Sequence, residues 1–519
     1  MNRVVSTLTL ALLAGGPLVG LVFGLLWPPK DPWGLSPTPW LEQLQDATPA
    51  MVLSLSLALV VASLATIVGG AIAWWVGRTN APGRRWIQVA TLLPLGMPSY
   101  VLAASLAVEL GPAGGLYWLG LPDRGVVPSA LVLVLITAPI AQLIVGVALT
   151  KVSAAEIEAA RSLGASRWRV FRSVVWPRLR ASVGFAFLLS ALYALSDFGA
   201  VAVFDCPVLT WSLYQAVRGQ ALAEAVILGG ATLLAATPLF ALAWAVRGSS
   251  RVGGVANPRP APRWSWRPVD ALGLMLSSGF VVGLGLCVPV ITLLNWVVSG
   301  WVQGEVFASP WSATWQTLAV AVAGASLTWC VAWSPALRSA RGHRGTEWVV
   351  YGVSALPAIL LAFGWILTAR HVGGVAGYAW WVGSGILLAM SYAARFISEV
   401  HAPLDAGLRR IDPRWRDVGR TLGATPSTMA RRVWLPALSP AMRVAWLLGF
   451  LAIVKELPMT LLLGPMGMRT LAFRVWDRYE EALWHDVGVH ALILLLIALG
   501  GVVWTLRMES RVQHQGSLA

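Results

Sequence analysis

Three charged side chains stand inside long apolar stretches of this sequence, where a charge is costly. Asp197 lies late in one stretch, and Lys455 and Glu456 lie late in another, with Glu456 259 residues after Asp197. An ionised group at the centre of a bilayer costs roughly 3 kcal/mol on insertion scales, so it should face protein or a water-filled path. Two interpretations stay open. Either the carboxylates line such a path, where their oxygens suit a hard cation, or Lys455 or a helix end neutralises them and they fix helix packing.

Two prolines interrupt apolar stretches at matched places. Pro98 and Pro357 are also 259 residues apart. Matched breaks are typical of discontinuous helices near a translocation site, although proline kinks also occur in membrane helices without any such role. Both interpretations stay open.

Several kinds of chemistry lack their motifs. The chain has no H-E-x-x-H, no G-x-S-x-G and no G-x-x-x-x-G-K-[ST] phosphate loop, so neither an enzyme site nor ATP binding by that route is expected. The six histidines form no metal-ligand pair at helical spacing, and Cys206, Cys287 and Cys330 are far apart. We therefore expect no metal site and no cofactor in this chain.

The composition of the chain indicates the secondary structure in which these residues lie. The chain is 57% hydrophobic and only 12% charged, with a mean hydropathy of +0.70, far from the roughly 25% charged residues of soluble domains. Its apolar runs reach the ~20 residues that a membrane-spanning helix needs, and the alternating pattern of barrel strands is absent. The expected fold is an all-α polytopic membrane protein. The net charge of +15 is attributed to membrane orientation rather than to nucleic-acid binding.

The apolar runs predict about 12 transmembrane helices. They lie near residues 4–27, 51–76, 86–110, 125–150, 181–205, 221–246, 272–298, 312–335, 347–368, 375–398, 439–462 and 486–507. The connections after spans two, four, six, eight and ten are all rich in arginine, and the others are nearly neutral. Because basic loops are retained in the cytoplasm, both termini are expected there.

The chain repeats itself. The interval from Gly164 to Gly423 is 259 residues, and so is the interval from Pro177 to Pro436. Each half holds six predicted spans, so the repeat is parallel. We expect a first half at residues 1–250, a linker at 251–268 and a second half at 269–519.

Each half carries one long basic connection, near residues 154–177 and 412–436. In the second, Asp412 can cap a helix, Gly423 can end it and Thr425 can begin another. Gly164 and Ser166 serve the same turn in the first, and Pro177 and Pro436 mark where the chain bends into the next span. Two short helices at an angle are expected in each connection.

The first connection resembles the "EAA" loop of binding-protein-dependent ATP-binding-cassette importers. It reads Glu158-Ala159-Ala160, then Gly164, then Val174-Val175-Trp176-Pro177, at the spacing of that family. The second copy keeps Gly423 and Pro436 but has Asp417-Val418-Gly419 at the Glu-Ala-Ala position. The resemblance implies that both loops couple to an ATPase subunit. Because the second loop departs from the motif, the two loops are expected to engage the ATPase subunits unequally.

The resemblance also implies function and partners. A fused permease of this class sits in the bacterial inner membrane, contacts two ATP-binding-cassette ATPase subunits in the cytoplasm and receives its solute from a periplasmic binding protein. The stretches Leu195-Ser196-Asp197-Phe198-Gly199-Ala200 and Val454-Lys455-Glu456-Leu457-Pro458 look similar to those of ferric-iron importer permeases. Ferric iron is therefore the expected solute, with thiamine, phosphonate or another small solute as alternatives. Asp197, Glu456, Lys455, Pro98 and Pro357 are then candidates for the translocation path.

Two rival classes stay open beside the importer. A polytopic membrane enzyme would need a catalytic constellation, and none is found. An ion-driven secondary transporter could have parallel halves, but it would have no reason for two matched coupling loops.

Overall fold

The computed structural model describes residues 15–26, 40–249, 268–412 and 414–516. These residues form helices joined by turns, with no β-strand in the ranges given. Helices are expected for a chain in lipid, because every backbone N–H and C=O group must find its partner within the protein. The chain divides into two compact units: unit 2 holds Lys30–Glu305, and unit 1 holds Met1–Pro29 with Val306–Ala519. Each unit is described here by itself.

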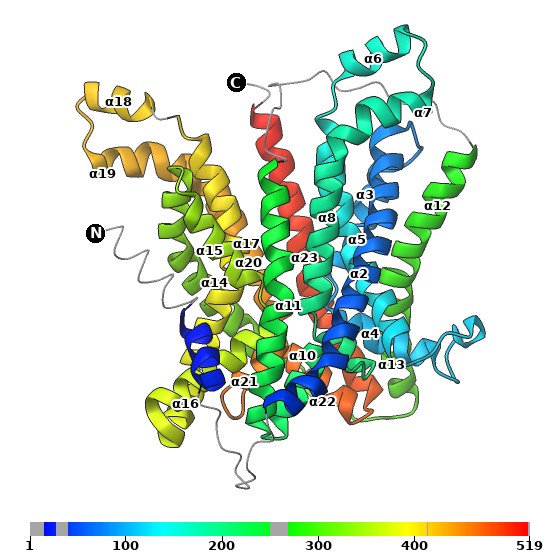
Figure 1. Cartoon of the computed structure of the whole chain (residues 1–519), viewed down its shortest axis with the longest axis vertical. Coiled ribbons are helices and arrows are strands. Elements are labelled where there is room, and N and C mark those ends of the chain that lie inside the picture. Colours follow the sequence, from blue (N-terminus) through cyan, green and yellow to red (C-terminus); the bar gives the residue numbers. More distant parts are fainter. Residues whose placement is uncertain (1–14, 27–39, 250–267, 413, 517–519) are drawn as a thin grey trace. The chain divides into compact units, whose positions relative to one another are not determined.

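Unit 2 contains the helices α2 to α13 (Figure 1). Its main spans and their short companions are α2 (Trp40–Arg78), α3 (Arg84–Ala90), η1 (Leu93–Gly96), α4 (Ser99–Leu110), η2 (Tyr117–Leu119), α5 (Val126–Thr150), α6 (Ala154–Ser162), α7 (Arg167–Val170), η3 (Phe171–Val175), α8 (Trp176–Ser196), α9 (Gly199–Val203), α10 (Leu209–Arg218), α11 (Leu222–Ser249), α12 (Pro268–Val282), η4 (Gly283–Cys287) and α13 (Val288–Val302). Helices α2, α5 and α8 pack together at its centre. Gly69 allows the closest approach, because a Cβ atom there would lie 2.1 Å from the Ala138 carbonyl oxygen on α5.

Unit 1 repeats most of this plan. It contains the helix Gly15–Leu26 followed by α14 (Trp311–Ala340), α15 (Arg344–Ala355), α16 (Ala358–Gly383), α17 (Ile386–Arg410), α18 (Arg414–Thr421), α19 (Pro426–Met429), η5 (Ala430–Trp434), α20 (Leu435–Val454), α21 (Pro458–Leu463), α22 (Leu471–Glu480) and α23 (Trp484–Gly516). Helices α14, α17 and α20 occupy the places that α2, α5 and α8 hold in unit 2. Both α5 and α17 have 25 residues, and each begins after a glycine of positive φ, Gly125 or Gly385.

The described residues hold eight helices long and apolar enough to cross a membrane, or ten if each of two bent helix pairs counts as one span. This agrees with a polytopic all-α membrane protein. The other two expected spans are less regular. Residues 4–27 are described only in part, as the 12-residue helix Gly15–Leu26. The span expected at 375–398 is divided between the end of α16 and the first half of α17, which begins at Ile386 and extends to Arg410.

The two compact units do not coincide with the two halves of the repeat, because the first span of each half packs in the unit formed mainly by the other half. Gly15–Leu26 belongs to unit 1, where Thr368 of α16 donates a 2.6 Å hydrogen bond to the Gly16 carbonyl oxygen. Helix α12, the first span of the second half, belongs to unit 2, where Gly273 lies against the Trp75 ring of α2. The expected linker at 251–268 lies outside the described residues except for its last residue. A repeat read from sequence intervals carries no information on which helices pack together, so this exchange of first spans could not be predicted.

Candidate functional site

The first long connection folds into an elbow of two short helices. This first elbow, residues 154–175, comprises α6, α7 and η3, and it extends beyond the ends of α2, α5 and α8 in unit 2 (Figure 1). Gly164 ends α6 with φ +76°, and the N–H groups of Gly164 and Ala165 donate to the carbonyl oxygens of Arg161 and Ala160. The Ser166 hydroxyl accepts a hydrogen bond from the Arg169 N–H and so caps α7. The expected turn chemistry is therefore found in the first copy.

The second elbow, residues 414–434, repeats this geometry in unit 1. Gly423 ends α18 with φ +71°, and its N–H and that of Ala424 donate to the carbonyl oxygens of Arg420 and Gly419. Thr425 accepts from the Thr428 N–H. Asp412 accepts from the Arg414 N–H at 2.9 Å and so caps α18 as its sequence position predicts.

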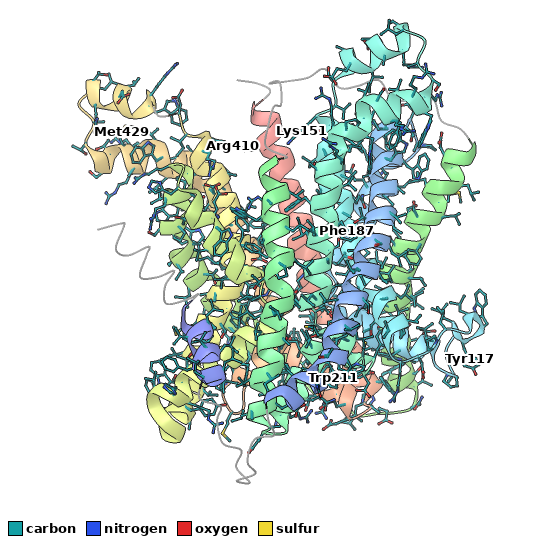
Figure 2. All side chains as sticks on the ribbon, in the orientation of Figure 1. Tyr117, Lys151, Phe187, Trp211, Arg410 and Met429 are labelled. Atoms are coloured by element: carbon teal, nitrogen blue, oxygen red, sulfur yellow. The ribbon has the colours of Figure 1, made fainter. Side chains whose placement is uncertain are left out.

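The departure of the second copy from Glu-Ala-Ala has a packing explanation. In the first elbow, Ala160 packs against an apolar cluster that contains the buried side chain of Val170. In the second, Gly419 takes the place of Ala160 and Met429, labelled in Figure 2, that of Val170. A Cβ atom at Gly419 would lie 2.2 Å from the Met429 sulfur. A smaller residue on one short helix thus makes room for a larger one on the other, and the fold of the elbow is kept.

Pro177 and Pro436 were expected to mark a bend from each elbow into the next span, but the helix is continuous at both prolines. A π-helical turn, η3 or η5, joins the elbow to the next span, and each proline is the second residue of that span, α8 or α20. The helices are continuous over Arg167–Ser196 and Ser427–Val454. Proline has no N–H to donate within a helix, and a π turn is a common way to accommodate a local change in the hydrogen-bond ladder.

Both elbows present apolar side chains to the surroundings. Leu163 and Leu422, one residue before each turn glycine, are 87% and 79% exposed. Glu158, Ala159, Asp417 and Val418 are exposed beside them. Large exposed apolar side chains at the tip of a protruding, basic elbow are typical of a docking surface for another protein.

The repeated carboxylates Asp197 and Glu456 both act as backbone caps. Asp197 is 8% exposed and accepts a 2.8 Å hydrogen bond from the Ala200 N–H at the start of α9. Glu456 accepts a 2.9 Å bond from the Met459 N–H at the start of α21. Each lies in a break where a long span gives way to a short helix. The interpretation that helix ends neutralise these carboxylates thus has direct hydrogen bonds behind it.

The matched prolines stand at sharp breaks in unit 2 and unit 1. The helix pair before and after Pro98 is bent by 96°, and so is the pair before and after Pro357. Both prolines are buried and directly precede the second helix of the pair. The geometry is that of a discontinuous helix rather than of a mild kink.

A charged cluster in unit 1 joins the predicted candidate Lys455 with two residues, Arg395 and Glu399, that the sequence analysis did not single out. Arg395 and Glu399 were assigned to the end of a span and to the basic connection after it, yet α17 continues to Arg410, so both lie near the middle of the helix. Arg395 donates to the Ser354 carbonyl oxygen beside the Pro357 break. The Lys455 ammonium lies near enough to Glu399 for electrostatic attraction.

The repeat makes this cluster informative. Helix α5 has the length of α17, and its residues at the positions of Arg395 and Glu399 are Leu135 and Pro139. The same helix thus folds with apolar residues there, so packing does not require the charges. Two charges in the middle of a helix, present in one copy of the repeat and absent from the other, are a candidate contact for a polar solute.

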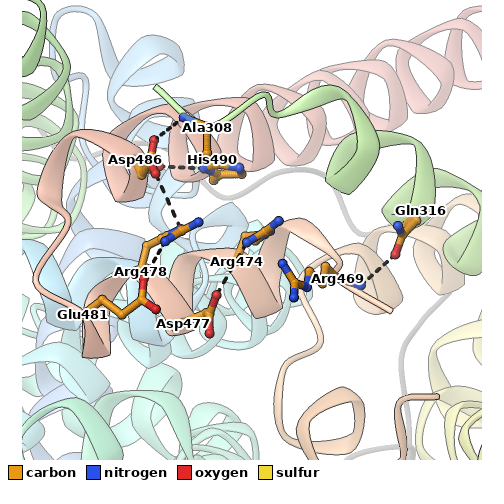
Figure 3. A network of polar contacts seen from close by, with 9 residues as sticks. All are labelled: Ala308, Gln316, Arg469, Arg474, Asp477, Arg478, Glu481, Asp486 and His490. Atoms are coloured by element: carbon orange, nitrogen blue, oxygen red, sulfur yellow. Dashed lines mark hydrogen bonds and ion pairs between the residues drawn. The ribbon is translucent and has the colours of Figure 1, made fainter. Parts of the chain in front are cut away.

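The opposite end of unit 1 carries a network of polar contacts (Figure 3). Asp486, buried in the first turn of α23, accepts a 2.9 Å hydrogen bond from the Ala308 N–H and pairs with Arg478 of α22. The carbonyl oxygen of Asp486 also lies 2.7 Å from His490 Nδ1. These contacts fasten α22, α23 and the segment before α14, so we assign the network to structure.

No group of three or more histidine, cysteine, aspartate or glutamate side chains that could hold a metal ion occurs among the described residues.

Comparison with known proteins identifies relatives for both halves. The family described as "Binding-protein-dependent transport system inner membrane component" matches residues 65–249 and 324–507. The chain is 26% identical over 435 residues to the "Fe(3+)-transport system permease protein FbpB 2" of Haemophilus influenzae, covering 80% of this chain and 81% of that one. It is 29% identical to the "Probable sulfate transport system permease protein cysT" of Chlorella vulgaris, over 39% of this chain and 82% of that one. It is 30% identical to the "Molybdenum transport system permease protein ModB" of Escherichia coli, over 30% of this chain and 70% of that one.

Proposed function

Because the chain belongs to the family of inner membrane components of binding-protein-dependent transport systems, we propose that it is the permease through which an ATP-driven importer moves ferric iron into the cytoplasm. The Haemophilus ferric-iron permease corresponds to both halves of this chain. The sulfate and molybdenum permeases correspond to 39% and 30% of it. This two-half correspondence supports ferric iron over the oxyanions, and thiamine and phosphonate stay as alternatives.

In this proposal the two elbows dock on two separate ATPase subunits in the cytoplasm, and both chain termini lie on that side. The observation that carries it is the repeated elbow, with the same turn glycine, the same π turn and an exposed leucine at the same place, Leu163 or Leu422. ATP hydrolysis belongs to the partners. A periplasmic binding protein delivers the solute at the opposite end.

The solute path in this proposal runs beside the charged cluster of Arg395, Glu399 and Lys455. Charges inside membrane spans are rare and face protein or water rather than lipid. All three side chains are mostly but not completely buried, and this supports access from a narrow water-filled path. Glu456 then shapes the path by fixing the helix break next to Lys455, and Asp197 fixes the equivalent break in unit 2.

Docking is tested by replacing the exposed leucines with aspartate. Leu163→Asp and Leu422→Asp should each reduce copurification of the ATPase subunits, because each places a charge in an apolar contact. Leu119→Asp is the matched control, since Leu119 is an exposed leucine at the other end of unit 2. Full copurification with the doubly substituted chain would contradict docking through the elbows.

The solute is tested by uptake in cells that lack this protein. Loss of the chain should abolish uptake of radiolabelled ferric iron and leave sulfate, molybdate and thiamine uptake unchanged. Unchanged iron uptake would exclude ferric iron. Loss of uptake for one of the other solutes would identify the permease as specific for that solute.

A further inference from the structure

Next to each elbow, an arginine joins the ends of two long helices. In unit 2 this residue is Arg78, the last residue of α2, whose side chain is buried at 4% exposure. Its Nη2 donates a 2.9 Å hydrogen bond to the carbonyl oxygen of Leu149, near the end of α5. The Leu149 carbonyl oxygen also accepts from the Val152 N–H just after the helix, and the arginine adds a charged donor, which binds more strongly than a neutral one.

In unit 1 the corresponding contact comes from Arg409, near the end of α17. Its Nη2 donates a 2.8 Å bond to the carbonyl oxygen of Ser339, near the end of α14. Two carboxylates hold the guanidinium in place, Glu347 at 2.7 Å and Asp405 at 2.8 Å. The Glu347 carboxylate is buried and also accepts from the Ser339 hydroxyl.

The two contacts are equivalent in position but opposite in direction. Leu149 and Arg409 are each the second-to-last residue of helices with equal length. In unit 2 the arginine is on the first helix and reaches the second, and in unit 1 it is on the second helix and reaches the first. Both halves therefore keep the joint between the two helix ends while differing in the residue that makes it.

The joint lies directly before the elbow in each unit. Helix α5 ends at Thr150 and α6 begins at Ala154, and α17 ends at Arg410 and α18 begins at Arg414. A force applied to an elbow thus reaches the end of α5 or α17 on one side, and α8 or α20 on the other side, where the helix is continuous. The arginine contact passes that displacement on to α2 or α14, so the pair moves as one body.

We propose that Arg78 and Arg409 are positioning residues that convert movement of the elbows into movement of the paired spans, and so couple ATP hydrolysis to solute transport. This inference rests on the proposed function, because it needs a motor that moves the elbows. The fold itself does not depend on the contact alone. In unit 2, apolar packing of Ala73, Ala141 and Val145 also joins α2 to α5.

The test uses the full chain with its ATPase subunits and binding protein in lipid vesicles. Arg78→Met, Arg409→Met and the double variant should copurify with the ATPase and hydrolyse ATP, while the amount of solute moved per ATP falls about tenfold in the double variant, within the usual range of coupling effects. Arg78→Lys and Arg409→Lys keep a charged donor and should restore most of that ratio. Arg341→Met is the control, because Arg341 follows α14 directly but is exposed.

The outcomes separate this inference from the proposed function. An unchanged ratio of solute to ATP in the double variant would overturn the inference. So would a ratio that the lysine variants leave as low as the methionine variants do. If a methionine variant does not reach the membrane, Arg78→Gln and Arg409→Gln replace it, with an intermediate ratio expected and a normal ratio overturning the inference. Failure of the proposed function would instead appear as full ATPase copurification with the Leu163→Asp, Leu422→Asp chain.

Discussion

At the scale of single residues, the repeat places two carboxylates in the same structural role, one in each half of the chain. Asp197 and Glu456 occupy equivalent positions, and each accepts from the N–H three residues later. The side chain of glutamate is one methylene longer, yet the contact is the same. A carboxylate that caps the first turn of a short helix stabilises the break in the backbone by that contact alone. Its function is then to hold a shape rather than to bind an ion.

This role predicts a clear difference between two substitutions of Asp197. Asp197→Asn keeps an oxygen that accepts from the Ala200 N–H, so thermal stability in detergent should change little. Asp197→Leu removes the cap and should cost about 1 kcal/mol, a typical value for a lost N-cap. Thermal unfolding followed by size-exclusion chromatography measures both. Equal destabilisation by asparagine and leucine would show that the charge, not the cap, matters.

Lys455 gives the opposite prediction, because its charge rather than its shape is expected to matter. Lys455→Met removes the electrostatic partner of Glu399 and should lower solute transport roughly tenfold, equivalent to a barrier about 1.4 kcal/mol higher, with ATPase copurification unchanged. Lys455→Arg should retain transport. Lys151→Met is the control, since Lys151 is exposed after the end of α5 (Figure 2). Normal transport by Lys455→Met would remove Lys455 from the path.

At the scale of elements, the turns and helix caps could be predicted well from the sequence, whereas the ends of the long helices could not. The turn glycines Gly164 and Gly423 and the cap Asp412 follow from chemistry within a few residues, so the elbows could be predicted in detail. The helix there instead runs from Ile386 to Arg410, whereas a hydropathy pattern ends the span between the charges of Arg395 and Glu399. The packing of α17 against α14 and α20 shows that the helix continues past both charges.

The turn glycines themselves can be tested. Both have a positive φ, which costs other residues roughly 1–2 kcal/mol. Gly164→Ala and Gly423→Ala should therefore distort the elbows and reduce ATPase copurification. Gly146→Ala is the matched control, because Gly146 lies in α5 with open space around its Cβ position. Copurification that is equal for the elbow variants and the control would mean that the turn does not set the docking surface.

At the scale of the whole molecule, the exchange of first spans predicts how fragments of the chain behave. Each compact unit contains residues from both halves of the repeat. Coexpressed fragments 1–250 and 268–519 should therefore copurify without a covalent link. Removing residues 268–305 from the second fragment and 1–29 from the first should weaken this association strongly. If the shortened fragments copurify as well as the full ones, the exchanged spans do not hold the halves together.

The same exchange sets an order of events during biosynthesis. Unit 2 still lacks α12 and α13 when the ribosome has finished the first half, and unit 1 needs a helix that entered the bilayer before any of its other spans. Unit 2 therefore cannot be completed when the first half has been translated, and unit 1 combines an early helix with spans that are made only in the second half. The early helix Gly15–Leu26 must wait in the lipid, and α2 keeps an uncovered apolar surface, until the later spans are inserted. Membrane insertase factors that shield such surfaces should therefore matter more for this chain than for a permease whose halves each close on their own.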